Sequence, residues 1–432
     1  MNYSSVIEYL YGLQKHGIKL GLETMRLLLE RVGNPHASLR VLHIGGTNGK
    51  GSTAAMAAAM LHCAGRRVGL YTSPHLVEFR ERIRVNGGMI TEDHVGALIT
   101  RLRAVTKDDL QPTFFEMTTA MALLHFAESE VDVAVLEVGL GGRFDATNVI
   151  DQPLATAITT IGMDHQEYLG NTEGAIAFEK GGIIKPGVPV VIGRVGQEAE
   201  QVLRGIAQER SAPLWRLGQD FCLERDGAGR LVYRGVRHVI DDVSCGLAGH
   251  HQWDNAACAL ALLEAAEGRG IDMSESAVRE GLQTVSWEGR LETIDEHPTV
   301  MLDGAHNPAA AQALARYLRE YTSRHPASRV ILVWGMMRDK DHRGFITPLL
   351  PMVSEIVLTQ AALVRSATVH ELRAVLHEWH GPVQEAVLPM EALAVARGRA
   401  TSRDLICIAG SLMLLGDIKA AVRGCGLSPI RG

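Results

Sequence analysis

The chain has 432 residues, too many for one ordinary hydrophobic core, so two domains are expected. Hydrophobic residues make up 46% of it and charged residues 21%, the balance of a soluble globular protein. Its net charge is -6 and no block of basic residues occurs, which argues against nucleic acid as a partner. No apolar run reaches membrane-spanning length, so no membrane association is expected.

The N-terminus and the cysteines indicate a cytoplasmic protein. The first residues lack the charged and apolar regions of a signal peptide. The six cysteines are scattered without a Cys-x-x-Cys pair, which argues against a zinc site or a disulfide framework. A reducing compartment fits this pattern.

The first part of the chain alternates predicted helices and strands. Two helices are predicted within residues 4–32, the second over 22–32. The following helices are predicted at 52–62, 92–106, 118–128 and 173–180, and the strands at 40–44, 67–71, 131–138, 154–161 and 188–192. This order predicts an α/β domain with a mainly parallel sheet.

A glycine-rich stretch, residues 44–52, lies between the first strand and its helix and carries Lys50. Glycines let backbone N–H groups curl around an anion, the helix start adds positive potential, and the lysine supplies a charge. The match to the common phosphate-loop pattern is imperfect, because Ile44 replaces a glycine and Gly51 replaces a hydroxyl residue. Ser52 brings the hydroxyl one position late. We interpret the stretch as a loop that binds a nucleoside triphosphate.

Polar clusters follow several of the predicted strands. They are residues 72–75, the stretch 137–148 that begins with Glu137, and residues 162–165. Ligands of open α/β sheets lie outside the carboxyl ends of the strands. These clusters therefore predict one site at that edge.

The chain changes character after residue 213, where residues 221–234 read as a β-hairpin, followed by a helix over 254–266. A second α/β series begins after the segment 286–291. Its predicted strands are 299–302, 330–334, 355–358 and 405–408, and its predicted helices are 308–321, 369–379 and 390–400. We therefore expect domains at residues 1–288 and 289–432.

Ten motifs in this order resemble the folylpolyglutamate synthase/dihydrofolate synthase family of the Mur ligase superfamily. They are GTNGKGS (46–52), TSPHL (72–76), TFFE (113–116), EVGLGGRFDATN (137–148), GMDH (162–165), EKGGIIKPG (179–187), HHQWDNA (250–256), GR (289–290), DGAHNP (303–308) and GSLMLLGD (410–417). The resemblance covers nearly the whole chain.

The resemblance implies an N-terminal P-loop ATPase domain and a C-terminal Rossmann-like domain. It also implies ATP-dependent amide formation, in which a substrate carboxylate becomes an acyl phosphate and L-glutamate then attacks it. The expected partners are ATP, L-glutamate, dihydropteroate and reduced folates, with Mg²⁺ as cofactor and the protein as a monomer. Such chemistry needs a phosphate cradle, a metal and cations near the developing acyl phosphate.

Site residues follow from the same resemblance. The residues implied in catalysis are Lys50, Lys180 and His306, with Lys180 carbamylated as in the family's Glu-Lys position. Those implied in ATP binding are Thr47, Asn48, Gly49, Lys50, Gly51, Ser52, Asn255, Arg290 and Asp303. The implied metal ligands are Ser73, Glu137 and His165, and the implied folate or pteroate contacts are Thr113, Phe114, Phe115, Glu116, Phe144, Asp145 and Ala146.

Several of these residues have simpler explanations from the sequence alone. Without the family pattern, Lys180 reads as a solvated helix lysine and His165 as a loop residue. The structural alternative for Glu137 is a cap of a neighbouring helix, and the aromatic pair Phe114 and Phe115 reads as core. Asn307 and Pro308 form an ordinary N-cap with a first-turn proline, which explains neither Asp303 nor His306.

Other functions also remain open. A ligase that adds an amino acid to a peptidoglycan precursor would need a uridine-nucleotide domain, and only 45 residues precede Gly46. A nucleotide-binding switch protein fits the acidic and histidine cluster poorly, and a dehydrogenase does not explain Lys50. Within the family, the acceptor is dihydropteroate, a reduced folate or both; both are expected, with a monofunctional folylpolyglutamate synthase as the alternative.

Overall fold

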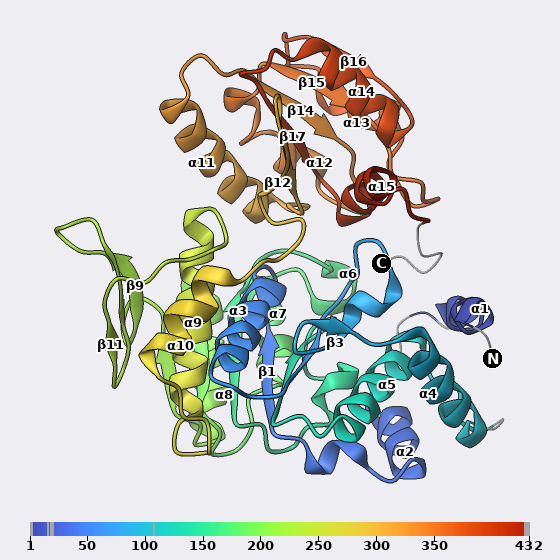
Figure 1. The fold of residues 1–432 in the computed structure, drawn as a ribbon, viewed down its shortest axis with the longest axis vertical. Helices are drawn as coiled ribbons and strands as arrows, with labels where there is room; N and C mark the ends of the chain where they lie inside the picture. Colours follow the sequence, from blue (N-terminus) through green and yellow to red (C-terminus); the bar gives the residue numbers. More distant parts are fainter. Residues whose placement is uncertain (1–2, 15–16, 18–20, 107–108, 427–432) are drawn as a thin grey trace. The chain divides into compact units, whose positions relative to one another are not determined.

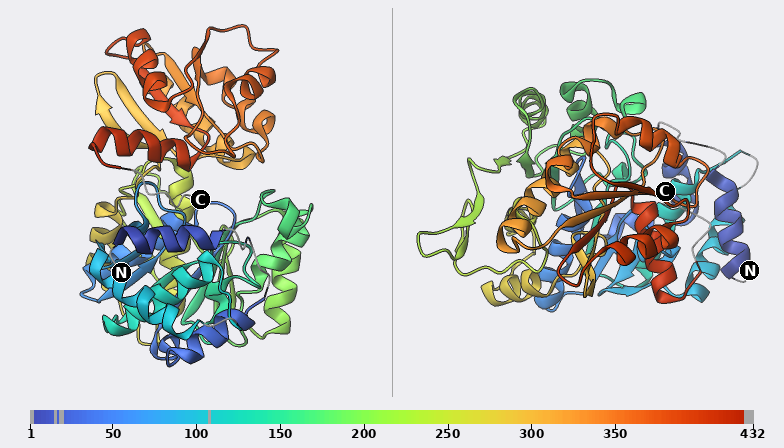
Figure 2. Two further views of the ribbon diagram at one scale, coloured as in Figure 1. Left: turned by 90° about the vertical axis from the view of Figure 1, so that its right-hand side faces the viewer. Right: turned by 90° about the horizontal axis from the view of Figure 1, so that it is seen from above.

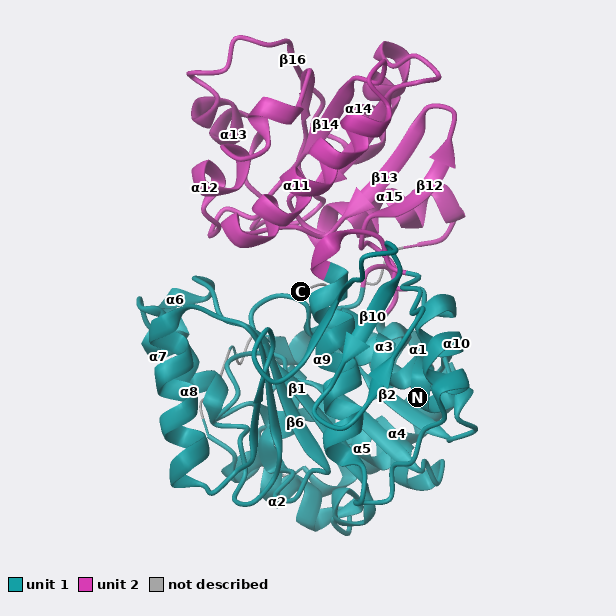
Figure 3. Cartoon of the chain, turned by 90° about the vertical axis from the view of Figure 1, so that its left-hand side faces the viewer, with its two compact units in different colours: residues 1–75, 79–246, 252–286 teal, residues 76–78, 247–251, 287–432 magenta. Residues whose placement is uncertain are grey.

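The computed structural model describes residues 3–14, 17, 21–106 and 109–426, which form two compact units. The first comprises residues 1–75, 79–246 and 252–286, and the second residues 76–78, 247–251 and 287–432 (Figure 3). Within the described ranges, no helix is long and apolar enough to cross a membrane.

The first unit is built on an eight-stranded sheet with the order β4-β3-β2-β5-β1-β6-β7-β8 (Figure 1). Six of its strands pair in parallel, namely β2, β5, β1, β6, β7 and β8. At one end of the sheet, β3 and β4 are added in antiparallel orientation. The strands are β1 (Val41–Gly45), β2 (Val68–Tyr71), β3 (Ile83–Val85), β4 (Gly88–Met89), β5 (Val133–Glu137), β6 (Ala155–Thr160), β7 (Val190–Arg194) and β8 (Leu214–Arg216).

Helices cover both faces of this sheet, with α7 and α8 on one side and α3 and α9 on the other (Figure 3). The helices of the first unit are α1 (Tyr3–Leu13), α2 (Glu23–Arg31), α3 (Lys50–Cys63), α4 (Glu92–Val105), α5 (Phe114–Glu128), α6 (Gln166–Leu169), α7 (Glu173–Gly181), α8 (Gln197–Glu209), α9 (His250–Ala266) and α10 (Glu275–Thr284). Short 3₁₀ turns are η2 (Pro35–Ser38), η3 (Phe79–Arg82) and η4 (Ala146–Val149). The first turn of α9 is shared with the second unit.

A small antiparallel sheet projects from the first unit (Figures 1 and 2). It has the order β11-β10-β9 and consists of β9 (Cys222–Arg225), β10 (Leu231–Arg234) and β11 (Val239–Ile240). The predicted hairpin is therefore confirmed, with a third strand added at its edge.

The second unit contains a six-stranded sheet with the order β12-β13-β17-β14-β15-β16, parallel except for β12. Its strands are β12 (Glu292–Glu296), β13 (Thr299–Asp303), β14 (Val330–Trp334), β15 (Glu355–Leu358), β16 (Val383–Glu385) and β17 (Leu405–Ala409). Its helices are α11 (Pro308–Arg324), α12 (His342–Ile346), α13 (Val369–Val375), α14 (Pro389–Arg399) and α15 (Leu412–Arg423), with a 3₁₀ turn η5 (Leu350–Met352).

Strand register brings the ends of the central strands of the first unit level with one another. Ile44 of β1 pairs with Glu137 of β5, and Gly45 pairs with Ile158 of β6. The chain therefore leaves β1, β5 and β6 at the same edge of the sheet, as the sequence predicted. In the second unit, Asp303 at the end of β13 lies opposite Ala409 of β17.

The predicted α/β class with two α/β units is confirmed, but two helix starts were predicted too late. Helix α5 begins at Phe114 rather than Thr118, because Thr113 and Glu116 form a reciprocal capping box at its start. Helix α9 begins at His250 rather than Asp254. Five helices, α6, α8, α10, α12 and α15, and the strands β3, β4, β8, β12 and β16 were not predicted from the sequence.

Two short stretches that precede residue 287 belong to the second unit. Leu76 and Val77 belong to its hydrophobic core, together with residues such as Val300 and Ile408. Residues 247–251 also belong to this unit, whose main part begins at Trp287. The two units therefore do not divide the chain at a single point.

Candidate active site

The glycine-rich stretch forms a tight loop between β1 and α3. Gly46 and Gly49 have φ angles of +137° and +86°, a region that side chains rarely adopt. A Cβ on Gly46 would lie 2.1 Å from Oγ1 of Thr159, and one on Gly49 would lie 2.2 Å from Oδ1 of Asn255. The glycines are therefore required both by the turn and by close neighbours.

Two threonines at the end of β6 hold the loop in place. The backbone N–H of Asn48 donates to Oγ1 of Thr160 at 2.9 Å, and the hydroxyl of Thr159 donates to the Asn48 carbonyl at 2.6 Å. The Gly162 N–H donates to Oγ1 of Thr47 at 3.0 Å. No local sequence pattern indicates that Thr159 and Thr160 serve this loop, because their role depends on the pairing of β6 with β1.

The start of α3 is suited to bind an anion. Gly49 occupies its N-cap position, and no side chain caps the helix there. An α-helix leaves its first N–H groups without partners inside the helix, and its dipole favours negative charge at that end. Nζ of Lys50 lies over the loop, donating to the carbonyls of Gly46 and Thr47 at 3.1 Å each.

Ser52 lies in the first turn of α3 with 1% of its surface exposed, and its hydroxyl has no hydrogen-bond partner. An unsatisfied buried hydroxyl is rare and costs free energy. Such a group fits a ligand site that takes a phosphate oxygen or a metal ion. Ser52 is therefore suited to contact a ligand, although it stands one position later than the hydroxyl residue of the common motif.

Lys180 lies beneath the phosphate loop. It is 5% exposed, and its Nζ donates to the Gly46 carbonyl at 2.9 Å. Burial, together with the nearby charge of Lys50, lowers its pKa to about 7, against the opposing effect of Asp164 and Asp145. Its neighbour Glu179 pairs instead with Arg143 at 2.6 Å. The interpretation of Lys180 as a solvated helix lysine is therefore wrong.

Glu137 and Ser73 lie together at the end of β5. The Glu137 side chain is 4% exposed, and its Oε2 accepts a hydrogen bond from the backbone N–H of Ser73 at 3.0 Å. This explains how a carboxylate tolerates the end of a buried strand, and it is not the helix cap that the sequence alone suggested.

His165 lies at the N-cap position of α6 with a φ of +51°. Its side chain is 45% exposed, and its ring lies 3.9 Å from the carboxylate of Asp164. Within the described ranges, no three His, Cys, Asp or Glu side chains gather as a ready-made metal site. A magnesium site built on one buried carboxylate and a hydroxyl would be completed by phosphate oxygens and water, which is the usual arrangement for this ion.

The structure brings the two stretches predicted to contact folate together. A Cβ on Gly139 would lie 2.3 Å from the ring of Phe115, so this ring packs directly on the backbone of the 137–148 loop. Phe115 is half-buried, whereas Phe114 is buried in the core, edge-on to Phe79. Phe144 is half-buried beneath the guanidinium of Arg143, which lies 4.1 Å from its ring centre.

The polar members of these stretches stabilise the local fold. Thr113 and Glu116 form the capping box of α5. Asp145 is buried and accepts hydrogen bonds from the N–H groups of Leu140 and Thr147 at 2.8 and 3.0 Å. Burial raises the pKa of Asp145, although these hydrogen bonds oppose the shift. Ala146 follows it in η4 and is buried.

The second unit brings Arg290, Asp303 and His306 together. The Arg290 guanidinium lies against Gly304, where a Cβ would meet its Nη1 at 2.2 Å. The buried Asp303 carboxylate accepts from the N–H groups of Leu291 and Ala305 at 3.0 Å each. His306 donates from Nδ1 to the Gly304 carbonyl at 2.7 Å. Asp303 thus fixes the turn that carries Arg290.

Asn307 and Pro308 form the start of helix α11, as the sequence predicted. Oδ1 of Asn307 accepts from the Ala310 N–H at 3.0 Å and caps α11, and Pro308 occupies the first turn.

Comparisons with known proteins place this geometry in one class. Residues 44–263 match the Mur ligase middle domain, and residues 289–412 match the Mur ligase, glutamate ligase domain. With a phosphate loop at the carboxyl edge of its first sheet, the protein is an ATP-dependent ligase of the Mur type.

Individual relatives narrow this class. The chain is 36% identical to the dihydrofolate synthase/folylpolyglutamate synthase of Bacillus subtilis, over 98% of this chain and 99% of that protein. It superimposes on Escherichia coli FolC in complex with DHPP and ADP with a TM-score of 0.89, at 32% identity over 98% of each chain. The bifunctional enzyme of Yersinia pestis, complexed with AMPPNP and a Mn ion, has a TM-score of 0.89 at 31% identity over 98% of each chain. The chain belongs to the dihydrofolate synthase/folylpolyglutamate synthase family, which confirms the resemblance seen in its motifs.

Proposed function

We propose that this protein uses ATP to join L-glutamate to dihydropteroate and to the glutamate tail of reduced folates, through an acyl phosphate. The observation that carries this proposal is the joint position of the phosphate loop, the buried Lys180 beneath it and Glu137 on the adjacent strand end. Phosphoryl transfer requires little beyond positioning and charge stabilisation, and these residues supply both.

The phosphate loop is proposed to hold the nucleotide. The N–H groups at the start of α3 and the charge of Lys50 suit its phosphates. Asn255, whose amide packs against Gly49, is suited to contact the base or ribose. In the second unit, Arg290 is proposed to add a cation, on the turn that Asp303 fixes.

Mg²⁺ is proposed to bind Glu137, Ser73 and His165. The buried carboxylate of Glu137 and the hydroxyl of the adjacent Ser73 are hard oxygen donors, which fit this ion. When bound, the ion neutralises charge between nucleotide and acceptor. The imidazole of His165 is a softer ligand than Mg²⁺ prefers, so its assignment as a ligand rests on the family pattern alone.

Lys180 is proposed to act as a carbamate. Carbon dioxide reacts with a neutral amine, and the lowered pKa of about 7 makes this form abundant near neutrality. Loss of the amine proton and gain of a carboxylate would replace a cation beneath the phosphate loop with an acceptor for metal or for a neighbouring donor.

The folate acceptor is proposed to contact the rings of Phe115 and Phe144. These two are half-buried, whereas Phe114 lies in the core and Thr113, Glu116 and Asp145 already bond to backbone groups. The latter three would then shape the site rather than bind the ligand.

The two domains are proposed to carry out different steps of the reaction. Residues 1–288 would activate the acceptor carboxylate, and residues 289–432 would present the incoming glutamate, with His306 near its amino group. Residues 76–78 and 247–251 are part of the second compact unit, so they are proposed to act with residues 289–432. A cytoplasmic monomer is proposed; within the described residues no disulfide joins two cysteines, which fits a reducing compartment.

One experiment tests the activity and the acceptor. The purified protein is incubated with MgATP, labelled glutamate and either dihydropteroate or tetrahydrofolate, and the products are separated by chromatography. Labelled product from both acceptors is expected. Product from tetrahydrofolate alone would favour the monofunctional alternative. No product and no glutamate-dependent ADP release would overturn the proposal, and Lys50→Ala provides the inactive control.

A further inference from the structure

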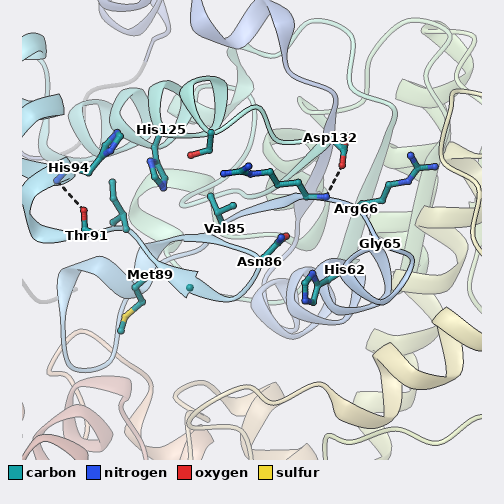
Figure 4. A pocket seen from close by; sticks show the side chains of 14 residues that line it. His62, Gly65, Arg66, Val85, Asn86, Met89, Thr91, His94, His125 and Asp132 are labelled. Carbon is teal, nitrogen blue, oxygen red and sulfur yellow. Dashed lines mark hydrogen bonds between the residues drawn. The ribbon is translucent and has the colours of Figure 1, made fainter.

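The first unit contains a cavity of about 580 Å³ that the proposed reaction does not use (Figure 4). It is lined by the turn between α3 and β2, the β3–β4 hairpin, the start of α4 and the end of α5. The phosphate loop adjoins the other end of α3. At 1.5 Å per residue, the 14 residues of this helix separate the two places by about 20 Å. The cavity therefore lies at the amino ends of the strands, away from the candidate active site.

Two neutral side chains that line this cavity keep a hydrogen-bond donor available. Oδ1 of Asn86 accepts from the Val68 N–H at 2.7 Å, which leaves the NH₂ end of its amide for a ligand. Oγ1 of Thr91 accepts from the His94 N–H at 3.3 Å, which leaves its hydroxyl proton available. The acidic lining residue Asp132 already accepts from the Arg67 N–H at 2.7 Å.

The charge of the cavity is positive although the whole protein carries -6. Arg66 and Arg67 both line it, and no ion pair involves either guanidinium within the described residues. His94 and His125 form the opposite side in Figure 4, with Asn86 between them and Arg66. Burial lowers the pKa of His125 to about 4, aided by His94 and Arg67 and opposed by Glu128.

We propose that this cavity binds a small multivalent anion that carries carboxylate or phosphate groups. Charge-assisted hydrogen bonds from Arg67 and Arg66, with neutral donors from Asn86 and Thr91, match such a ligand. The volume lies within the usual range of small-molecule sites. Two sources share this chemistry: a chain of γ-linked glutamates, and a free phosphate or pyrophosphate.

The test is calorimetric titration of the full-length protein, with the nucleotide site saturated by MgADP. The probes are tri-γ-glutamate, inorganic phosphate and inorganic pyrophosphate, each titrated separately. Saturable binding of at least one is expected, and the probe that binds identifies the source. Absence of saturable binding for all three would overturn the proposal.

Variants then locate the binding. Asn86→Asp keeps the acceptor for Val68 but replaces the donor by a negative charge, and Arg66→Ala with Arg67→Ala removes both cations. Each is expected to weaken binding at least about tenfold, the loss of one or two charge-assisted hydrogen bonds. Arg204→Ala, on the exposed face of α8, removes an equal charge elsewhere and is expected to leave affinity unchanged. Equal affinity in parent, Asn86→Asp and the double variant would place the anion elsewhere and refute the assignment.

Discussion

Replacing Lys180 by methionine is expected to stabilise the nucleotide-free protein, most at low pH and least at high pH. In the folded chain the pKa of Lys180 is about 7, against its ordinary value of 10.5. Between these values the unfolded chain binds the proton and the folded chain does not, so the stability of the parent rises with pH. Methionine binds no proton at either end of this range, so its advantage shrinks as pH rises.

The size of the effect follows from the two pKa values. Below pH 7 the full difference of 10.5 − 7 units corresponds to about 5 kcal/mol of unfavourable charge burial. At pH 9 the folded amine is already neutral, so the cost of burying a charge is gone. About 2 kcal/mol remains because the unfolded amine still holds its proton and is favoured by it. The advantage of Lys180→Met is therefore expected to fall by about 2–3 kcal/mol between pH 6 and pH 9. Loss of the hydrogen bond to Gly46 reduces the advantage at every pH.

Urea unfolding followed by circular dichroism measures this difference. Parent and Lys180→Met are compared at pH 6, 7.5 and 9 in bicarbonate-free buffer without Mg²⁺ or nucleotide. The two units need not unfold together, so the transition that moves with the substitution is the one analysed. A stability gap that stays constant or widens from pH 6 to pH 9 would refute the lowered pKa.

The same amine gives a chemical readout. At pH 7 a lysine with the ordinary pKa of 10.5 is neutral in only about one molecule in 3,000, whereas a pKa of about 7 makes half the amines neutral. With ¹³C-bicarbonate and Mg²⁺, a carbamate signal is expected in the carbon NMR spectrum of the parent and not of Lys180→Met. Lys180→Ala is expected to be nearly inactive and partly rescued by short carboxylates. A parent without the signal, or a fully active Lys180→Ala, would exclude the carbamate.

Four further substitutions test the proposed site. Lys50→Ala is expected to lower kcat/KM by at least about 10²-fold while the circular dichroism spectrum stays unchanged, since it removes a charge aimed at the phosphates; parent-like turnover would contradict the loop assignment. Glu137→Gln is expected to raise the Mg²⁺ concentration for half-maximal rate about tenfold, and His165→Ala less, so identical magnesium titrations would remove both from the metal site. Arg290→Ala is expected to raise KM for ATP about tenfold through one lost charge-assisted hydrogen bond, and an unchanged KM would place it outside the nucleotide site.

The sequence determined the features that depend on neighbouring residues. The alternation of strands and helices, the glycine-rich turn before Lys50, the hairpin near residue 226 and the cap at Asn307 all arise from local backbone preferences and short-range hydrogen bonds. The start of α5 was equally local, because Thr113 and Glu116 carry the spacing of a capping box. That start could have been predicted from the sequence.

Only the tertiary structure decided which of these features meet. Lys180 and Gly46 are 134 residues apart in sequence, yet they are in contact, and burial at this place lowers the pKa of the Lys180 amine. Asn255 reaches Gly49 only because α9 packs beside the loop, and Leu76 joins the core of the second unit. Burial, desolvation and close packing depend on segments distant in the chain, so a local pattern carries no record of them. The sequence therefore determined the elements and their polar ends, and tertiary packing determined the charge and environment of each group there.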